Sequence, residues 1–562
     1  MKSNFLLRTK ILFVCVLFFS LFLIIKLFLV QVAHSEFYKQ EANRQYATPS
    51  SSIFERGTIY FTERNGNLVS AAMQTSGFKL AIDPTKIKEI ENAYTKLSTI
   101  VPIDKADFLA RANKKNDTYE EIAHNMTQAQ ADSISALKLS GVNLFKQKWR
   151  FYPGDSMAAQ SLGFVAYKGD ELGGRYGLER QYEEVLSRNK NTPYVNFFAE
   201  VFSNINQTFF SDEEKAGNVV TTIEPAVQSF LEDSLEGVKN KYNADSMGAI
   251  IMSPKDGSIY ALSVKPDFNL NDFSKVSNVS IFSNPLVENV LEWGSVVKPI
   301  VVAAALDAGV VTAGTKYEDK GSVIVEKKEI FNFDKKARGV VDMVEVLKQS
   351  LNTGMVYMYQ KLGKERLRDY LLSFGIKEKT GIDLPNETSG LVSNLSSPRE
   401  LEYANASFGQ GIALTPVEIV RALAALGNDG KLVVPHLVRA IKYDDGTTKE
   451  LNYPTTNTKI SAVTSEEISR MLVKVMDEGL NGGRSKFINH SVAVKTGTAQ
   501  VARTDGKGYY EDRNTHSFFG YFPAYDPEFI VFLYAVNPKN VEFASETWSA
   551  PFLDITKFTF VF

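Results

Sequence analysis

The chain has 562 residues, and its 63 basic and 65 acidic side chains leave a net charge of −2. At roughly 100–200 residues per domain this length predicts more than one domain, and a hydrophobic share of 44% excludes a disordered or fibrous chain. The near-neutral charge argues against nucleic acid as a partner, and the single cysteine, Cys15, excludes an intramolecular disulfide and a cysteine-cluster zinc site.

The first predicted element is a membrane-spanning helix over residues 11–32. This run is apolar apart from Lys26, which lies near one end, and a helix of this length would measure about 33 Å, enough for a hydrocarbon core of about 30 Å. A cleaved signal peptide is the alternative. Its apolar region would be shorter, about 7–15 residues, and would end in a small-residue cleavage site, where this chain has Gln31. We therefore expect an uncleaved anchor.

The charges around this helix predict its orientation. Lys2, Arg8 and Lys10 precede the apolar run, and basic residues remain on the cytoplasmic side of a membrane. The sequence thus predicts a single-pass protein with residues 1–10 as a cytoplasmic tail and the rest of the chain outside the cytoplasm.

A mixed α/β segment is expected over residues 36–215. A polar helical stretch covers 116–139, and short strand-like pieces lie at 57–61 and 77–82. The polar run SDEEKAG at 211–217 is typical of a domain boundary.

The remainder, 216–562, begins and ends with strand-like runs that enclose helical ones. We expect strands at 219–223, 248–252, 258–264, 491–499, 517–522 and 529–536, and helices at 297–308, 343–362, 364–374, 416–426 and 465–479. This order, with strands at both ends and helices between them, predicts helices packed on a largely antiparallel sheet.

The run EWGSVVKPI at 292–300 carries the first chemical motif. Ser295 opens an apolar helical run, and Lys298 follows three residues later, so both side chains lie on one helical face. A hydroxyl nucleophile then has an amine nearby, which accepts its proton if burial or a neighbouring charge lowers the pKa of the amine. The N–H groups at the start of a helix also face a developing oxyanion.

Two further motifs follow in order. Ser350-Leu351-Asn352 places a hydroxyl and an amide two residues apart in a turn; the alternatives are a plain turn residue and a helix cap. Lys495-Thr496-Gly497-Thr498 ends a strand-like run, where Gly497 permits close backbone approach and the strand edge could pair with an extended peptide. A second Lys-Thr-Gly, at 379–381, follows a helix and leads into IDLP, so we interpret it as a loop.

With these three motifs the chain resembles a class B penicillin-binding protein, a D,D-transpeptidase. Ser-x-x-Lys, Ser-x-Asn and Lys-Thr-Gly form the motif set of penicillin-binding proteins and related lactamases. The resemblance covers nearly the whole chain, because further family segments match Arg56-Gly57-Thr58-Ile59, Arg64-Asn65-Gly66, Arg150 with Pro153-Gly154, Gly177-Leu178-Glu179, Ser407-Phe408-Gly409-Gln410-Gly411 and Ser517-Phe518-Phe519-Gly520.

The resemblance implies an α+β multidomain fold in three parts. The N-terminal transmembrane helix would be followed by a mixed α/β pedestal, a non-catalytic domain of dimerisation type at 36–215. The penicillin-binding transpeptidase domain at 216–562 would consist of an antiparallel sheet covered by helices, plus a helical subdomain. The protein would then lie in a bacterial cytoplasmic (inner) membrane, with its catalytic domain on the outer side.

The resemblance also implies the residues of the reaction. Ser295 would attack the carbonyl of the penultimate D-Ala of a peptidoglycan stem peptide, with Lys298 as the base. Ser350 and Lys495 would relay protons to the leaving amine, and Asn352 would hold the donor peptide amide. The predicted substrate-binding residues are Thr496, Gly497 and Thr498.

Partners and cofactors follow from the same family. Stem peptides and β-lactams would acylate Ser295, and a multi-pass glycan-strand polymerase with other division proteins would bind the anchor and pedestal. No cofactor and no metal is expected, since the five histidines are scattered without paired spacing. The Asn at 352 and the run at 378–390 resemble the division branch. An elongation-type transpeptidase, a β-lactam hydrolase or D,D-carboxypeptidase, and a non-catalytic scaffold of the division machinery remain alternatives.

Two positions depart from the family pattern. Trp293 stands where proline is usual, and Ser283 stands where arginine is usual before Asn284. We expect Trp293 to reshape the rim of the cleft.

Overall fold

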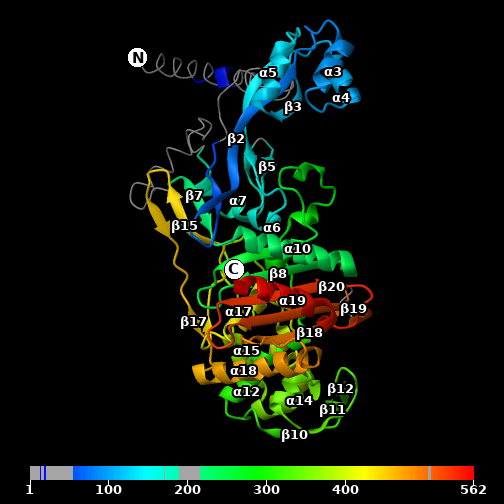
Figure 1. Cartoon of the computed structure of the whole chain (residues 1–562), viewed down its shortest axis with the longest axis vertical. Coiled ribbons are helices and arrows are strands. Elements are labelled where there is room, and N and C mark those ends of the chain that lie inside the picture. The colour runs from blue at the N-terminus through cyan, green and yellow to red at the C-terminus, as the bar shows by residue number, and fades with distance from the viewer. Residues whose placement is uncertain are drawn as a thin grey trace, which may run out of the picture. The chain divides into compact units, whose positions relative to one another are not determined.

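The computed structural model describes residues 55–169, 171–188, 215–503 and 508–561, together with residue 13 and residues 18–20 (Figure 1). The anchor predicted at 11–32 therefore lies, apart from these four residues, outside the described part of the chain. Among the helices that are described, none combines the length and the apolar character needed to cross a membrane.

The described residues form two compact units. One consists of Gly77–Lys148, and the other combines Glu55–Ser76, 149–188 and 215–561. Strand β2 (Leu68–Ile82) contributes residues to both.

The smaller unit is a layer of helices on a small sheet. The later part of β2 pairs antiparallel with β3 (Glu120–Met126), and β2 also pairs with β4 (Val142–Phe151). The helices are α3 (Ile90–Ser98), α4 (Lys105–Ala112) and α5 (Gln128–Ala136). Leu80, Leu97 and Phe108 are fully buried in its core.

The prediction of a polar helix at 116–139 is wrong for the first part of this range. Residues 120–126 form strand β3, and the helix begins only at Gln128. The Thr127 side chain accepts a hydrogen bond from the Gln130 N–H, and Gln130 reaches back to the Thr127 N–H. This capping box sets the start of the helix, and the preceding residues pair instead with β2.

The larger unit is built around a five-stranded antiparallel sheet, which confirms the sheet type expected from the sequence. Its order is β18-β19-β20-β8-β9. The strands are β8 (Ser246–Met252), β9 (Ile259–Lys265), β18 (Ala493–Ala502), β19 (Tyr509–Phe522) and β20 (Phe529–Val536).

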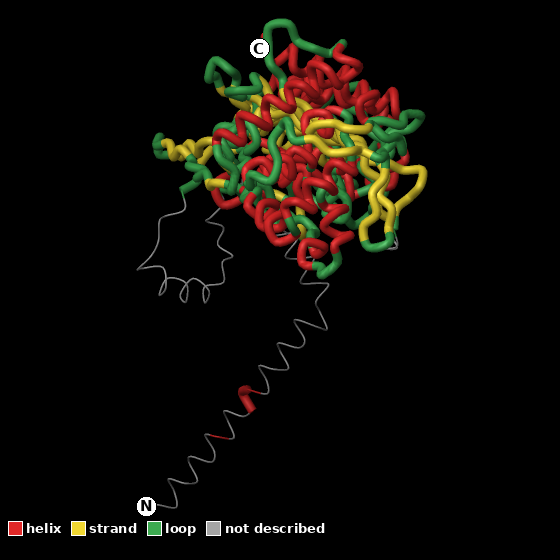
Figure 2. The backbone as a smooth tube through the Cα atoms, turned by 90° about the horizontal axis from the view of Figure 1, so that it is seen from below, coloured by secondary structure: helices red, strands yellow, loops and turns green. Residues whose placement is uncertain are grey.

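Helices cover both faces of this sheet, as Figures 1 and 2 show. On β19, Phe518 and Phe522 contact Phe552 of α19 (Ala544–Val561), whereas the Tyr521 hydroxyl hydrogen-bonds Ser469 of α18 (Ala462–Lys474). Alternate residues of a strand point to opposite faces, so α19 and α18 cover different sides. Helix α10 (Pro225–Tyr242) packs beside α19, and α17 (Pro416–Ala424) packs on β20.

The remaining helices and hairpins lie between β9 and β18 in the chain. The longer helices are α12 (Lys298–Asp307), α13 (Met343–Lys348), α14 (Asn352–Leu362), α15 (Lys364–Ser373) and α16 (Glu400–Ala406), and α11 (Pro285–Glu288) is a single turn. The paired strands are β10 (Lys316–Asp319) with β13 (Gly339–Asp342), β11 (Ser322–Val325) with β12 (Lys328–Phe331), and β14 (Lys431–Leu432) with β17 (Thr456–Asn457).

The single helix expected at 343–362 is instead two helices, α13 and α14. They are separated at Ser350, whose φ of +57° lies in the left-handed region. A residue in this conformation ends a right-handed helix, so the second motif occupies the break.

A second sheet of the larger unit joins distant parts of the sequence. Its order is β16 (Thr448–Glu450), β15 (Val438–Tyr443), β7 (Gly217–Thr221), β1 (Ile59–Thr62) and the start of β2. The hairpin β5 (Val165–Lys168) and β6 (Glu171–Gly174) and the short helices α6 (Ala159–Leu162), α7 (Gly177–Gln181) and α8 (Glu183–Leu186) complete the unit.

Candidate active site

Ser295 lies in a tight turn beside the edge strand β18. It is the middle residue of the 3-10 turn η4 (Gly294–Val296), which leads into α12. Gly294 has a φ of +58°, and a β-carbon there would lie 3.1 Å from the Thr498 carbonyl oxygen. Only glycine adopts this conformation without strain, so Gly294 brings the Ser295 turn close to the third motif.

Lys298 is the first residue of α12 and is completely buried. Its Nζ lies 2.6 Å from the Ser350 carbonyl oxygen, 3.2 Å from Ser350 Oγ and 2.8 Å from Asn352 Oδ1. The first and second motifs, which are more than fifty positions apart in the sequence, therefore meet at one amine.

Ser350 and Asn352 are held by the break between α13 and α14. Asn352 is the first residue of α14, and its Nδ2 donates to the Phe331 carbonyl oxygen at 2.9 Å. Both amide atoms of Asn352 are thus engaged, one with Lys298 and one with strand β12.

The third motif lies on β18, at one edge of the five-stranded sheet. Lys495 is buried and donates to the Thr496 carbonyl oxygen at 2.9 Å. A β-carbon on Gly497 would lie 2.5 Å from both Ser517 Oγ and the Trp293 carbonyl oxygen, so only glycine fits. Thr498 is exposed. Among the described residues no strand pairs with the other edge of β18, which leaves its backbone available to an extended peptide.

The two lysines have unusually low pKa values. Burial, and next the charge of Lys495, lower the pKa of the Lys298 amine well below its ordinary value of 10.5. Burial lowers the pKa of Lys495 to about 7. A buried ammonium without a carboxylate partner is costly, so the site favours the neutral amine, the form that accepts a proton.

The second Lys-Thr-Gly is a loop, as expected. The Glu387 carboxylate accepts hydrogen bonds from the N–H and hydroxyl of Thr380, at 2.6 and 2.5 Å, and from the Gly381 N–H at 3.1 Å. These contacts occupy the backbone donors of this copy.

The expectation that Trp293 reshapes the cleft rim is wrong. Its side chain is only 1% exposed and donates from Nε1 to the Leu414 carbonyl oxygen at 3.0 Å. The ring packs edge-on against Phe532 and Tyr534 of β20. Trp293 therefore belongs to the core beneath the Ser295 turn.

One contact that stabilises the Ser295 turn could not be predicted from the sequence. The Tyr509 hydroxyl donates to the Glu292 carboxylate, at 3.1 and 3.0 Å from its two oxygens. It links β19 to the segment just before Ser295. Glu292 adjoins the first motif, but Tyr509 is 217 positions away, and no pattern in the sequence connects the two.

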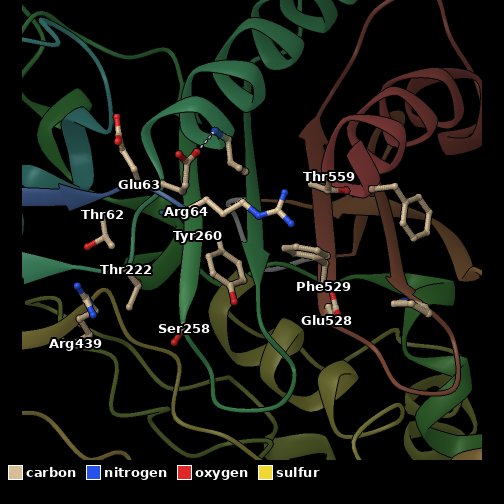
Figure 3. Close-up of a pocket in the computed structure, with 14 residues that line it drawn as sticks. Thr62, Glu63, Arg64, Thr222, Ser258, Tyr260, Arg439, Glu528, Phe529 and Thr559 are labelled. Carbon is tan, nitrogen blue, oxygen red and sulfur yellow. Dashed lines mark hydrogen bonds between the residues drawn. The ribbon is translucent and has the colours of Figure 1, made fainter. Parts of the chain in front are cut away.

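A pocket of about 460 Å³ lies apart from these residues (Figure 3). It is lined by Tyr260 at the start of β9 and Phe529 at the start of β20, with Arg64 extending toward its middle. None of the eight predicted site residues, all within the described ranges, contributes to it. The three motifs, and not this pocket, thus define the candidate active site.

Comparisons with known proteins agree with this geometry. Residues 247–556 match the family model of the penicillin binding protein transpeptidase domain, and residues 53–222 match that of the penicillin-binding protein dimerisation domain. The chain is 31% identical to stage V sporulation protein D of Bacillus subtilis (strain 168), over 98% of this chain and 85% of that protein.

Two further similarities are more distant. Peptidoglycan D,D-transpeptidase FtsI of Buchnera aphidicola subsp. Schizaphis graminum is 26% identical, over 95% of this chain and 91% of that protein. The crystal structure of penicillin binding protein 2X from Streptococcus thermophilus has a TM-score of 0.72 and 21% identity, over 91% of this chain and 80% of that one. The latter likeness concerns the fold alone.

These matches confirm a dimerisation domain followed by a transpeptidase domain, and an enzyme of the serine transpeptidase type. The transpeptidase model alone covers more than half of the chain, and a relative above 30% identity spans almost all of it. The chain belongs to the class B penicillin-binding proteins.

Proposed function

We propose that the protein crosslinks peptidoglycan stem peptides as a D,D-transpeptidase, through an acyl-enzyme on Ser295. The observation that carries this proposal is the environment of Lys298. Its buried amine has a strongly lowered pKa and contacts Ser350 Oγ and Asn352 Oδ1. An amine held neutral one helical turn from a serine is suited to take the serine proton.

Acylation begins when Ser295 Oγ attacks the carbonyl carbon of the penultimate D-Ala and its proton passes to Lys298. The N–H groups of Ser295 and Thr498 hold the oxyanion; such donors are worth ~3–4 kcal/mol each in other acyl-transfer enzymes. The bond to the terminal D-Ala then breaks, and Ser350 and Lys495 relay a proton to the departing amine.

Transfer follows when the amine of a second stem peptide attacks the ester. Its nitrogen forms the new amide bond, its proton returns through Lys298, and Ser295 Oγ is released. The donor peptide would pair with the free edge of β18 at Thr496–Thr498, with Asn352 holding a peptide amide. β-Lactams would acylate Ser295 because their amide occupies the same place.

In the cell we place this reaction in septal wall synthesis. Relatives named FtsI and the division-type second motif support this role. Residues 11–32 would anchor the protein in the cytoplasmic membrane with residues 1–10 inside, and the pedestal at 36–215 would carry the catalytic domain at 216–562. A multi-pass glycan-strand polymerase and division proteins would bind the anchor and pedestal.

Labelled penicillin tests the chemistry on the full-length protein in detergent. We expect a stable adduct on Ser295 that Ser295→Ala abolishes. Ser135→Ala, at an exposed serine of another Ser-x-x-Lys pair, should label like the wild type. Rapid release of the label would instead indicate a β-lactam hydrolase or D,D-carboxypeptidase.

The cellular role is tested separately by imaging and complementation. A fluorescent fusion at midcell supports the septal role, while one along the lateral wall indicates an elongation-type enzyme. Normal septation in cells carrying only Ser295→Ala would show that the protein acts as a scaffold.

A further inference from the structure

The amide of Asn352 has one allowed orientation. Its Nδ2 faces the Phe331 carbonyl oxygen at 2.9 Å, and its Oδ1 faces Lys298 Nζ at 2.8 Å. A carbonyl accepts only and an amine at this site donates. Rotating the amide by 180° would place Oδ1 against the Phe331 carbonyl oxygen, two acceptors, so the Phe331 carbonyl holds Oδ1 toward Lys298.

This orientation bears on the lone pair of Lys298. A neutral amine has two N–H donors and one lone pair. Two of its neighbours, the Ser350 carbonyl at 2.6 Å and Asn352 Oδ1 at 2.8 Å, only accept. They engage both N–H groups, and the lone pair remains for a hydroxyl proton.

A buried polar cluster fixes Asn352 and its partner Phe331. Asp319, Asn332 and Thr353 are at most 4% exposed. Asp319 Oδ1 accepts from the Thr353 hydroxyl at 2.7 Å, and both its oxygens accept from Asn332 Nδ2, at 3.0 and 3.1 Å. Asn332 Oδ1 in turn accepts from the Thr353 N–H at 3.3 Å. Asn332 is the residue after Phe331, and Thr353 is the residue after Asn352.

The cluster therefore ties strand β12 to the first turn of α14. The Thr353 N–H is one of the helix-end donors that would otherwise lack a partner, and the Tyr317 hydroxyl lies 3.2 Å from the Thr353 hydroxyl. Further backbone donors reach Asp319 from Gly321, at 3.1 Å, and Arg338, at 2.9 Å. A buried carboxylate with this many donors is held rigidly.

We infer that Asp319, Asn332 and Thr353 are positioning residues for the transpeptidase reaction. They set the Phe331 carbonyl and Asn352 at a fixed separation, and Asn352 then aims the lone pair of Lys298 at the reacting hydroxyls. The inference rests on the proposed function in one respect, the role of Lys298 as the base.

The test compares Thr353→Val with Thr353→Ser in the full-length protein. Valine has the same shape but lacks the hydroxyl that reaches Asp319, whereas serine keeps it. We expect Thr353→Val to lower the rate constant of acylation by labelled penicillin about tenfold, and Thr353→Ser to stay within about threefold of the wild type. Thr556→Val, which removes another fully buried hydroxyl hydrogen bond in α19, is the matched control and should acylate normally.

The pH profile separates positioning from a loss of structure. Asn352 Oδ1 favours the ammonium form of Lys298, and Lys495 is the charged group that opposes it. Displacing Oδ1 removes the favourable contact, so the acid limb of the acylation profile should move to lower pH in Thr353→Val. Simple destabilisation would lower the rate without moving this limb.

Asp319→Asn keeps the volume but replaces one acceptor oxygen by an NH2 donor and removes the charge, so it breaks the same cluster and gives a second measurement if Thr353→Val does not fold. A wild-type rate and an unmoved acid limb in a folded variant would overturn the inference. Absence of labelling in the wild type itself would instead contradict the proposed function.

Discussion

Two buried lysines, Lys298 and Lys495, give the site its electrostatic character. Neither has a carboxylate within its hydrogen-bonding contacts in the described residues, and both have lowered pKa values because of burial. For the proposed base Lys298, reactivity and stability are therefore linked, because the burial that favours its neutral form makes its protonation unfavourable in the fold.

This linkage predicts a pH-dependent stability. Between the lowered pKa of folded Lys298 and its ordinary 10.5, the unfolded chain binds a proton that the folded chain does not. Stability is therefore lost as the pH falls through this window and gained as it rises, by about 1.4 kcal/mol per pH unit. Relative to Lys298→Met, the wild type should therefore gain free energy of unfolding in urea as the pH rises toward 10.5.

Lys88→Met is the control for this measurement, because Lys88 is exposed. Its unfolding curves should follow those of the wild type at each pH. A constant difference between the wild type and Lys298→Met across the range would contradict a neutral amine at this position.

At the scale of elements, strand β19 shows how the sheet is fixed between its two helical layers. Phe518 and Phe522 face α19, whereas Tyr521 faces α18. Gly520 shares the α19 face, and a β-carbon there would lie 2.4 Å from the ring of Phe552. The ring of Phe552 thus fills the space that a side chain at position 520 would need.

Gly520→Ala should destabilise the protein by about 1–3 kcal/mol, since a well-packed interface must shift to admit the methyl group. Gly237→Ala in α10 is the matched change, because its β-carbon would meet nothing within 4 Å, and it should stabilise by about 0.5–1 kcal/mol. Thermal unfolding measures both. Equal midpoints for the two variants would show that Phe552 does not pack as described.

At the scale of the molecule, three family segments meet in one buried ion cluster. The Glu179 carboxylate accepts from Arg56 Nε and from Arg150 Nε, each at 2.5 Å, and Arg150 also donates to the Gly57 carbonyl oxygen at 2.7 Å. Burial alone would raise the pKa of Glu179, but the two guanidinium groups lower it below its ordinary value. The cluster thus joins residues 56–57 to 150 and 179 within the larger unit.

Replacing Glu179 by glutamine should cost about 3–5 kcal/mol, because it leaves the buried Arg150 without its counter-charge and leaves Arg56 with only the partly exposed Glu183, 2.7 Å from its Nη2. Glu184→Gln removes an exposed carboxylate five residues away and should change stability by less than about 0.5 kcal/mol. Differential scanning calorimetry of both variants tests this difference. A Glu179→Gln midpoint equal to that of Glu184→Gln would show that the cluster does not hold the unit together.

The sequence by itself determined the family, the serine transpeptidase type and most helices and strands of the catalytic domain. Motif order and local periodicity are properties of short segments, so they are visible without coordinates. The same logic failed at 120–126 and at Ser350, where a capping box and a left-handed residue override a helical pattern.

Only the tertiary structure decided what surrounds the motifs. Burial of Lys298, the contact of Tyr509 with Glu292, the core position of Trp293, and the Asp319 cluster behind Asn352 all join residues far apart in the chain. Such contacts depend on how helices and strands pack, and the pKa of a side chain depends on that packing. The motifs therefore name the candidate reacting groups, while the fold sets their burial and their contacts.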